Sequence, residues 1–276
     1  MSAPFQSDLQ DLYSRLLDDD SKAVFSELLS PWCQAQQEFC DWLRNFGQRP
    51  GQPFPPASTE ERQWLYALSR INDTLLLRFQ RLREDSQEPD SQDWAGPELS
   101  RGEYERFLEA LGMTFPWASD FSPFYHEIVE VIPAKSETAP IVLQDICWPA
   151  AMAGPLLFSR AGVVVTAGSQ ILDKMVAETS PLYWSYRRRN RPTCDLSQGW
   201  GHNSQWRTLF RRDYAWPEGF AYNVDGACDL AGSVTDAHPD QIPLARRIEL
   251  LTYRCWIHAP VLEEPWPFDD CYIERR

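Results

Sequence analysis

The sequence has little lysine, glycine and histidine, and it lacks the common phosphate-binding motifs. Only three of its 26 basic residues are lysines, so arginine carries nearly all of the positive charge. Neither a Walker G-K-[ST] motif nor a G-x-G-x-x-G motif occurs, and nothing else identifies a nucleotide site. No stretch of about 18 uncharged apolar residues exists, so we expect no transmembrane helix. No motif therefore assigns a reaction to the chain.

Metal-binding and disulfide patterns are also missing. The seven cysteines are an odd number and form no C-x-x-C pair, so we expect free thiols. His126 and Glu127 are followed by Glu130 where a zinc helix has its second histidine, so we expect neither a metal nor another cofactor. The first residues, Met1 to Asp8, lack the basic and apolar regions of a secretory signal. The sequence thus favours a cytoplasmic chain without a membrane association.

What is present indicates a folded acidic protein. The chain has 276 residues, 43% hydrophobic residues and 12 tryptophans, which is too much apolar surface for a disordered acidic tract. Its formal net charge is −14. Residues 1–120 hold 21 acidic and 11 basic residues, whereas residues 121–276 hold 19 and 15, so the negative charge is concentrated in the first part.

Residues 1–120 show the periodicity of helices. Apolar residues at intervals of three and four predict helices over 8–29, with an interruption near 18–21, and over 31–46, 59–83 and 103–111. Ser58 and Ser100 are each followed three residues later by glutamate, which is the capping-box pattern of a helix start. We therefore expect an acidic, bundle-like helical part.

Residues 121–276 change to short β-rich runs separated by long irregular loops. The sequence predicts strands over 124–132, 141–146, 156–166, 247–258 and 272–274, and helices over 169–178 and 181–189. The predicted fold class is α+β, a helical part followed by a mixed, mainly antiparallel sheet part. The predicted domains are 1–120 and 121–276, with an arginine- and tryptophan-rich loop region at 184–214; one continuous domain is the alternative.

The loop region 184–214 is the strongest candidate for a binding site. Seven arginines and one acidic residue, Asp195, lie between positions 187 and 212, a local net charge of +6. The candidate binding residues are Arg187, Arg188, Arg189, Arg191, Trp200, Trp206 and Arg212. Arginines among aromatic rings suit phosphates, carboxylates and single-stranded RNA. An acidic protein can instead pair such a run with its own carboxylates, and this internal interpretation is the one we favour.

The loop from Gly199 to Trp206 is the segment most typical of a catalytic site. His202 is a candidate general base, Asn203 a residue that orients a ligand, and Arg207 or Arg211 a clamp for an anion. No nucleophile motif accompanies them, so no residue is firmly catalytic. The alternative is a long loop held to the protein by its own polar side chains.

Three functional hypotheses follow. The first is a protein-binding protein, for example a bacterial immunity protein that neutralises a toxin by direct binding, since an acidic inhibitor suits a basic target. The second is an enzyme acting on an anionic phosphate or carboxylate substrate through a His/Arg site at 202–213. The third is an RNA-binding protein, which the acidic whole-chain charge disfavours. We favour the first hypothesis and a protein that is not an enzyme.

Overall fold

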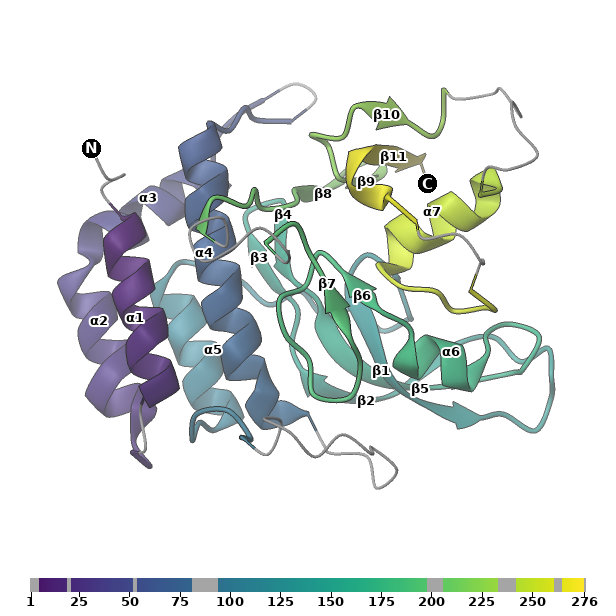
Figure 1. Ribbon diagram of the computed structural model, residues 1–276, viewed down its shortest axis with the longest axis horizontal. Helices are drawn as coiled ribbons and strands as arrows, with labels where there is room; N and C mark the ends of the chain where they lie inside the picture. Colours follow the sequence, from purple (N-terminus) through teal and green to yellow (C-terminus); the bar gives the residue numbers. More distant parts are fainter. Residues whose placement is uncertain are drawn as a thin grey trace. The chain divides into compact units, whose positions relative to one another are not determined.

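The computed structural model describes residues 5–18, 21–51, 54–80, 94–197, 206–232, 242–260 and 265–275. Within it the chain forms two compact units, whose elements are labelled in Figure 1. The first unit comprises residues 1–115, 151–154 and 184–210. The second comprises residues 116–150, 155–183 and 211–276. The first unit is helical and the second contains sheets, so the predicted α+β fold class is confirmed.

Helices form most of the first unit. Its elements are α1 (Gln6–Asp18), the π-helical turn η1 (Phe25–Leu29), α2 (Ser30–Ala35), α3 (Gln37–Gly47), α4 (Thr59–Leu76), the 3₁₀ turn η2 (Leu77–Phe79), α5 (Arg101–Ala110), β3 (Ala151–Ala153) and β7 (Thr193–Cys194). Both capping boxes are present: Ser58 accepts a hydrogen bond from the Glu61 amide, and Ser100 from the Glu103 amide. The predicted helix 31–46 is divided at Gln36 into α2 and α3.

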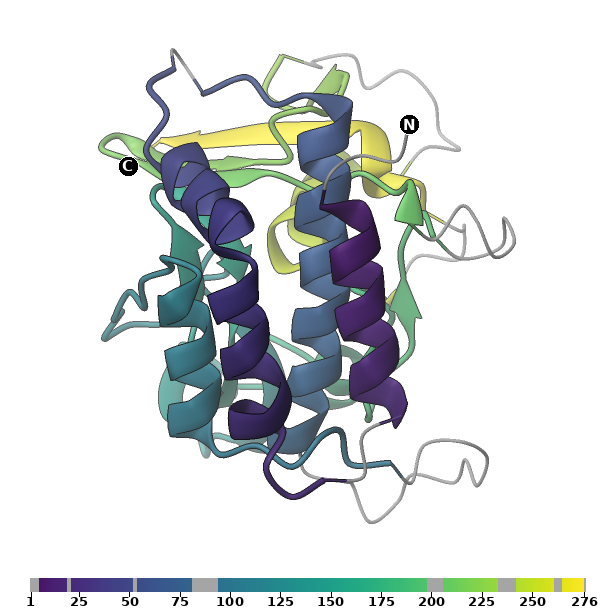
Figure 2. The same cartoon turned by 90° about the vertical axis from the view of Figure 1, so that its left-hand side faces the viewer.

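The helices of this unit lie side by side around an apolar interior (Figure 2). Leucines and aromatic residues on their inner faces are buried, among them Leu12, Phe39, Leu65 and Phe107. At the end of α3 the backbone of Gly47 approaches β3 so closely that a Cβ atom there would lie 2.7 Å from the Ala153 carbonyl carbon. A side chain at this position would therefore separate the helix from the strand.

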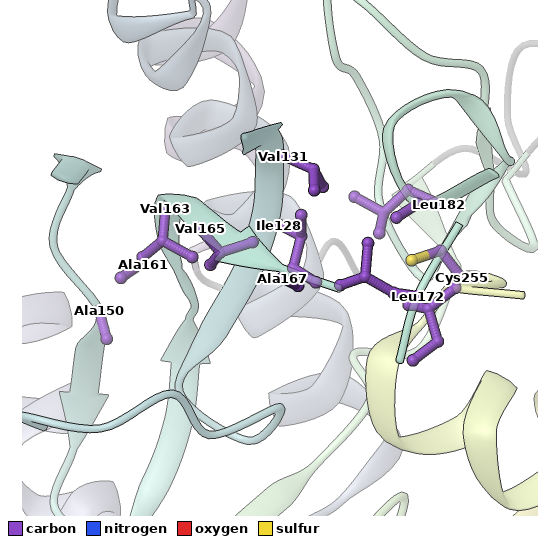
Figure 3. Close-up of a cluster of buried hydrophobic side chains, with 12 residues drawn as sticks. Ile128, Val131, Ala150, Ala161, Val163, Val165, Ala167, Leu172, Leu182 and Cys255 are labelled. Carbon is purple, nitrogen blue, oxygen red and sulfur yellow. The ribbon is translucent and has the colours of Figure 1, made fainter. Parts of the chain in front are cut away.

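A three-stranded sheet supplies the main apolar core of the second unit. Strand β1 (His126–Pro133) runs parallel to β5 (Ala161–Ala167), and β2 (Val142–Trp148) runs antiparallel to β5 on its other side. Ile128, Val131, Val163 and Val165 point into a cluster that also holds Leu172, Ala177 from α6 (Lys174–Thr179), Leu182, Cys255 and Ile257 (Figure 3). Alternate residues of β5, from Ala161 to Ala167, lie in this cluster, as the period of a strand requires, and the residues between them are also buried except Thr166.

A second sheet of this unit orders its strands β10 (Cys228–Asp229), β11 (Asp270–Arg275), β9 (Gly219–Tyr222), β8 (Asp213–Trp216) and β4 (Leu156–Ser159). Neighbours are antiparallel except β10 and β11. Arg160 separates β4 from β5 and is buried. The indole of Trp148 donates to the Arg160 carbonyl at 2.8 Å.

Two predicted elements are wrong. The strand expected over 247–258 is the helix α7 (Leu244–Tyr253), which follows Pro243 and ends at Arg254 in a left-handed conformation. Leu250 and Leu251 are both buried, which one face of a strand cannot provide.

The helix expected over 181–189 is also absent. Leu182–Tyr183 form the short strand β6, and Trp184 has φ +53°, which a right-handed helix cannot contain. The other expected strands are confirmed as β1, β2, β4, β5 and β11. Among the described residues, no helix is long and apolar enough to cross a membrane.

Candidate functional site

The arginine-rich segment 184–210 belongs to the helical unit and is held by α4. Asp73 of α4 accepts from the Arg188 guanidinium at 2.8 Å and from the Tyr186 amide at 2.8 Å. The Arg189 amide donates to Gln80, just beyond η2, at 2.9 Å. The side chains of Arg188 and Asp73 are nearly buried, so this ion pair is internal.

A stacked cluster holds the same segment further along α4. The guanidinium of Arg70 lies 3.8 Å from the ring centroid of Tyr186, 4.6 Å from that of Trp206 and 5.1 Å from that of Tyr13. The Tyr13 and Tyr186 hydroxyl groups share a hydrogen bond of 2.6 Å. Arg70 is buried, which lowers its pKa, but the tyrosines raise it and leave a net increase. Trp206, a predicted binding residue, therefore packs on the protein's own arginine.

The acidic residue within the arginine-rich run is used internally as well. Asp195 accepts from the Tyr66 hydroxyl at 2.6 Å and from the Ser197 hydroxyl and amide. Burial, and then the charge of Asp195, raise the pKa of Tyr66. Tyr66 therefore stays protonated and acts as a hydrogen-bond donor that ties residues 195–197 to α4.

The remaining predicted site residues in the described part of the chain differ in exposure and in their contacts. Arg187 is half-buried over the Trp94 ring and Arg191 is buried. Arg207 is exposed, and its backbone carbonyl accepts from Gln63.

Three further candidates, Trp200, His202 and Asn203, lie outside the described residues. The catalytic hypothesis built on His202 and Asn203 therefore remains a prediction. Arg211 and Arg212, by contrast, lie in the second unit, where both guanidinium groups are buried in ion pairs.

Carboxylates remain on the surface of the helical unit. We call acidic surface the set of exposed acidic residues that form no ion pair or side-chain hydrogen bond with another described residue: Asp18, Glu27, Glu38, Glu60 and Glu109. They come from α1, η1, α3, α4 and α5. Asp73, which forms the ion pair with Arg188, is not one of these residues. The described arginines of the segment therefore do not neutralise the charge of the acidic surface.

The second unit contains a buried arginine cluster around one carboxylate. Asp213 is fully buried at the start of β8 and accepts from Arg211 Nε at 2.7 Å, from Arg254 Nη2 at 2.9 Å and from the Asn223 amide at 2.7 Å. Arg160 Nη2 lies 4.0 Å from Asp213 and donates to the Thr252 carbonyl at 2.7 Å. The neighbouring Arg212 does not join this cluster but pairs with Asp225 at 2.7 Å.

Burial and charge act in opposite directions inside this cluster. Burial alone would raise the pKa of Asp213, but Arg211, Arg254 and Arg160 lower it to about 2. Burial, and then Arg254, lower the pKa of Arg160 to about 9. Burial and the charge of Arg160 also lower the pKa of His126 to about 4. At neutral pH Arg160, Arg211 and Asp213 are therefore charged and His126 is neutral.

Sequence reasoning missed Arg160, Arg254 and Asp213. Arg160 alone carried a local signal, because a single charge interrupts the apolar runs of β4 and β5.

Nothing in the described part of the chain gathers three His, Cys, Asp or Glu side chains in a way that could hold a metal ion. No protein-family model, curated protein or solved structure matches the chain.

Proposed function

We propose that this protein binds another protein of basic character through its helical unit. The observation that carries the proposal is the acidic surface: its carboxylates are exposed and unpaired within the described chain. The described ion pairs of the arginines between positions 187 and 212 use other acidic residues, namely Asp73, Asp213 and Asp225. The exposed carboxylates of the acidic surface are therefore not neutralised by the described arginines of segment 184–210.

Complementary charge gives such a surface a physical role. Exposed charges steer a partner of opposite sign into contact, raise the association rate and fix the orientation of docking. A concrete form of the proposal is a bacterial immunity protein that works in the cytoplasm and neutralises a basic toxin by direct binding. In this form the protein itself catalyses no reaction.

The test begins with recovery of the partner from the native host at low salt, followed by affinity measurements on the two purified proteins. The informative variant is Glu27→Lys/Glu38→Lys, which changes two positions of the acidic surface. The matched control is Glu130→Lys/Glu218→Lys, two exposed acidic residues of the second unit. We expect the first pair to weaken binding about tenfold or more, because each reversal replaces an attraction by a repulsion, and the control to change it less than about threefold.

Equal effects of the two double variants would place the docking surface elsewhere and contradict the proposal. Failure to recover any protein partner at low salt would contradict the wider claim of protein binding. Circular dichroism and thermal unfolding of each variant verify that exposed substitutions leave the fold intact.

A further inference from the structure

The buried arginine cluster of the second unit holds more positive charge than its own residues neutralise. It contains three guanidinium groups, those of Arg160, Arg211 and Arg254, and one carboxylate, that of Asp213. Their side chains are between 0% and 11% exposed. The carboxylate of Glu274 accepts from the Tyr222 hydroxyl and forms no ion pair with these arginines in the described structure. Among these four side chains, positive charges exceed negative charges by two.

The hydrogen-bond donors of the cluster are also in excess. Asp213 uses one oxygen for Arg211 and the Asn223 amide and the other for Arg254. Arg160 donates through Nη2 alone, and its Nε and Nη1 atoms are buried without a hydrogen-bond partner. The Nε atom of Arg254 is in the same state. Arg160 and Arg254 thus both carry unused donors, and the charge of Arg254 also lowers the pKa of Arg160.

Protein interiors rarely leave such groups unsatisfied. More than about 90% of buried polar groups have a protein or solvent partner, and a bound water or ion is one of the explanations for an exception. A water molecule can accept hydrogen bonds, but it leaves the excess charge unchanged, and buried charge without compensation is costly. An anion satisfies the donors and the charge together. The donors are shielded from solvent, so the anion must be small enough to be enclosed.

We propose that the cluster binds a small monovalent anion of halide size, coordinated by the Nε and Nη1 atoms of Arg160 and the Nε atom of Arg254. This site is separate from the proposed docking surface, and its role is to complete the core of the second unit. Bound anion stabilises the folded chain by mass action, because the unfolded chain does not assemble the three arginines.

The first experiment is crystallographic. Crystals of the full chain are grown with bromide in place of chloride, and data are collected at the bromine absorption edge. We expect an anomalous peak within hydrogen-bond distance of Arg160 Nε. A peak without anomalous signal identifies a water molecule and overturns the proposal, as does the absence of any peak.

The second experiment measures thermal unfolding at constant ionic strength while bromide replaces gluconate, an anion too large for the site. We expect the unfolding midpoint to rise with bromide for the wild type. In Arg160→Gln the apparent bromide affinity should fall about tenfold or more, since charge-assisted hydrogen bonds are lost. Arg101→Gln, at an exposed arginine of α5, is the control and should keep the wild-type response.

Equal midpoints of the wild type in bromide and gluconate would overturn the proposal, whatever the variants do. If Arg160→Gln does not fold, Arg254→Gln takes its place in the titration. An unchanged bromide response in either folded variant would show that the stabilisation arises elsewhere and would also overturn the site.

Discussion

Several arginine residues of this protein act in its interior. Arg70 stacks among Tyr13, Tyr186 and Trp206, and Arg160 and Arg211 are buried in an ionic cluster. The planar guanidinium group is weakly hydrated, stacks on rings and donates in fixed directions, so it tolerates burial better than an ammonium group. A lysine at these positions would lose both the stacking and the directed hydrogen bonds. The scarcity of lysine therefore matches the buried use of positive charge.

His126 should make the stability of the protein depend on pH. Its pKa is lowered from the ordinary 6.5 to about 4, so between these values the unfolded state binds a proton that the folded state does not. The free energy of unfolding should therefore fall by roughly 1–3 kcal/mol as the pH drops from about 6.5 to about 4. Urea unfolding across this range measures the change.

The control for this prediction is His126→Asn, which keeps an acceptor for the Ser122 amide that now donates to His126 Nδ1 at 3.0 Å. The variant is less stable overall because it loses the ring beside Phe121. Its stability should nevertheless change less with pH than that of the wild type. A pH dependence identical in both proteins would show that another group titrates.

Helix α4 is the element that organises the helical unit. Tyr66, Arg70 and Asp73 are spaced by four and three residues, so they share one face of the helix. Each of them contacts segment 184–197 of the chain: Tyr66 binds Asp195, Arg70 stacks on Tyr186, and Asp73 pairs with Arg188. This face is buried although it is polar. Hydrogen bonds, an ion pair and ring contacts therefore fix the segment to this face.

The two capping boxes should contribute measurably to stability. In α4 the Ser58 hydroxyl accepts from the Glu61 amide and the Glu61 carboxylate accepts from the Ser58 amide. Replacement of a capping serine by alanine removes an acceptor for an otherwise unpaired amide, so Ser58→Ala should cost about 1 kcal/mol. Ser14→Ala, at an exposed position inside α1, should change stability by less than about 0.5 kcal/mol. Denaturant unfolding distinguishes the two, and equal effects would contradict a role for the cap.

The ion pair between Asp73 and Arg188 should matter far more than a surface pair. Asp73→Ala leaves the buried Arg188 without this partner, which typically costs about 3–5 kcal/mol. The control is Asp41→Ala in α3, whose partner Arg44 is substantially exposed, and which should cost less than about 1 kcal/mol. Both values come from denaturant unfolding. Comparable losses for the two variants would mean that Asp73 and Arg188 are well solvated.

At the scale of the whole molecule, the described residues include exposed carboxylates and several buried arginines. The net charge of −14 is concentrated in residues 1–120, where several carboxylates are exposed. Buried arginines contribute to the total charge but present no guanidinium to an approaching partner. An approaching partner therefore meets a more negative surface on the helical unit than the arginine-rich sequence of segment 184–210 suggests.

This arrangement predicts that salt will affect association with a basic partner more than dissociation. The association rate constant should fall about tenfold or more between about 20 mM and 500 mM salt, while the dissociation rate constant changes little, because screening removes long-range steering first. Stopped-flow kinetics with the purified partner measure both. The salt dependence should be smaller for Glu27→Lys/Glu38→Lys, and an unchanged slope would argue against steering by the acidic surface.

The sequence by itself determined the features that depend on neighbours along the chain. The starts of α4 and α5 follow from Ser58 and Ser100 with their glutamates, and β1 and β5 follow from runs of β-branched residues. These signals are local because capping and strand propensity act over a few residues. The α+β class follows from the same signals.

Only the tertiary structure decided the partners of the buried charges and the form of the ambiguous segments. The apolar content of residues 247–253 suits either a strand or a helix. In the fold they belong to α7, in which Leu250 and Leu251 are both buried and which ends at Arg254 in the αL conformation. Arg160, Asp213 and Arg254 are far apart in sequence, and Arg188 is 115 positions from Asp73. Ionic contacts of this kind have no periodic pattern, because a carboxylate can pair with any guanidinium group that the fold brings within reach.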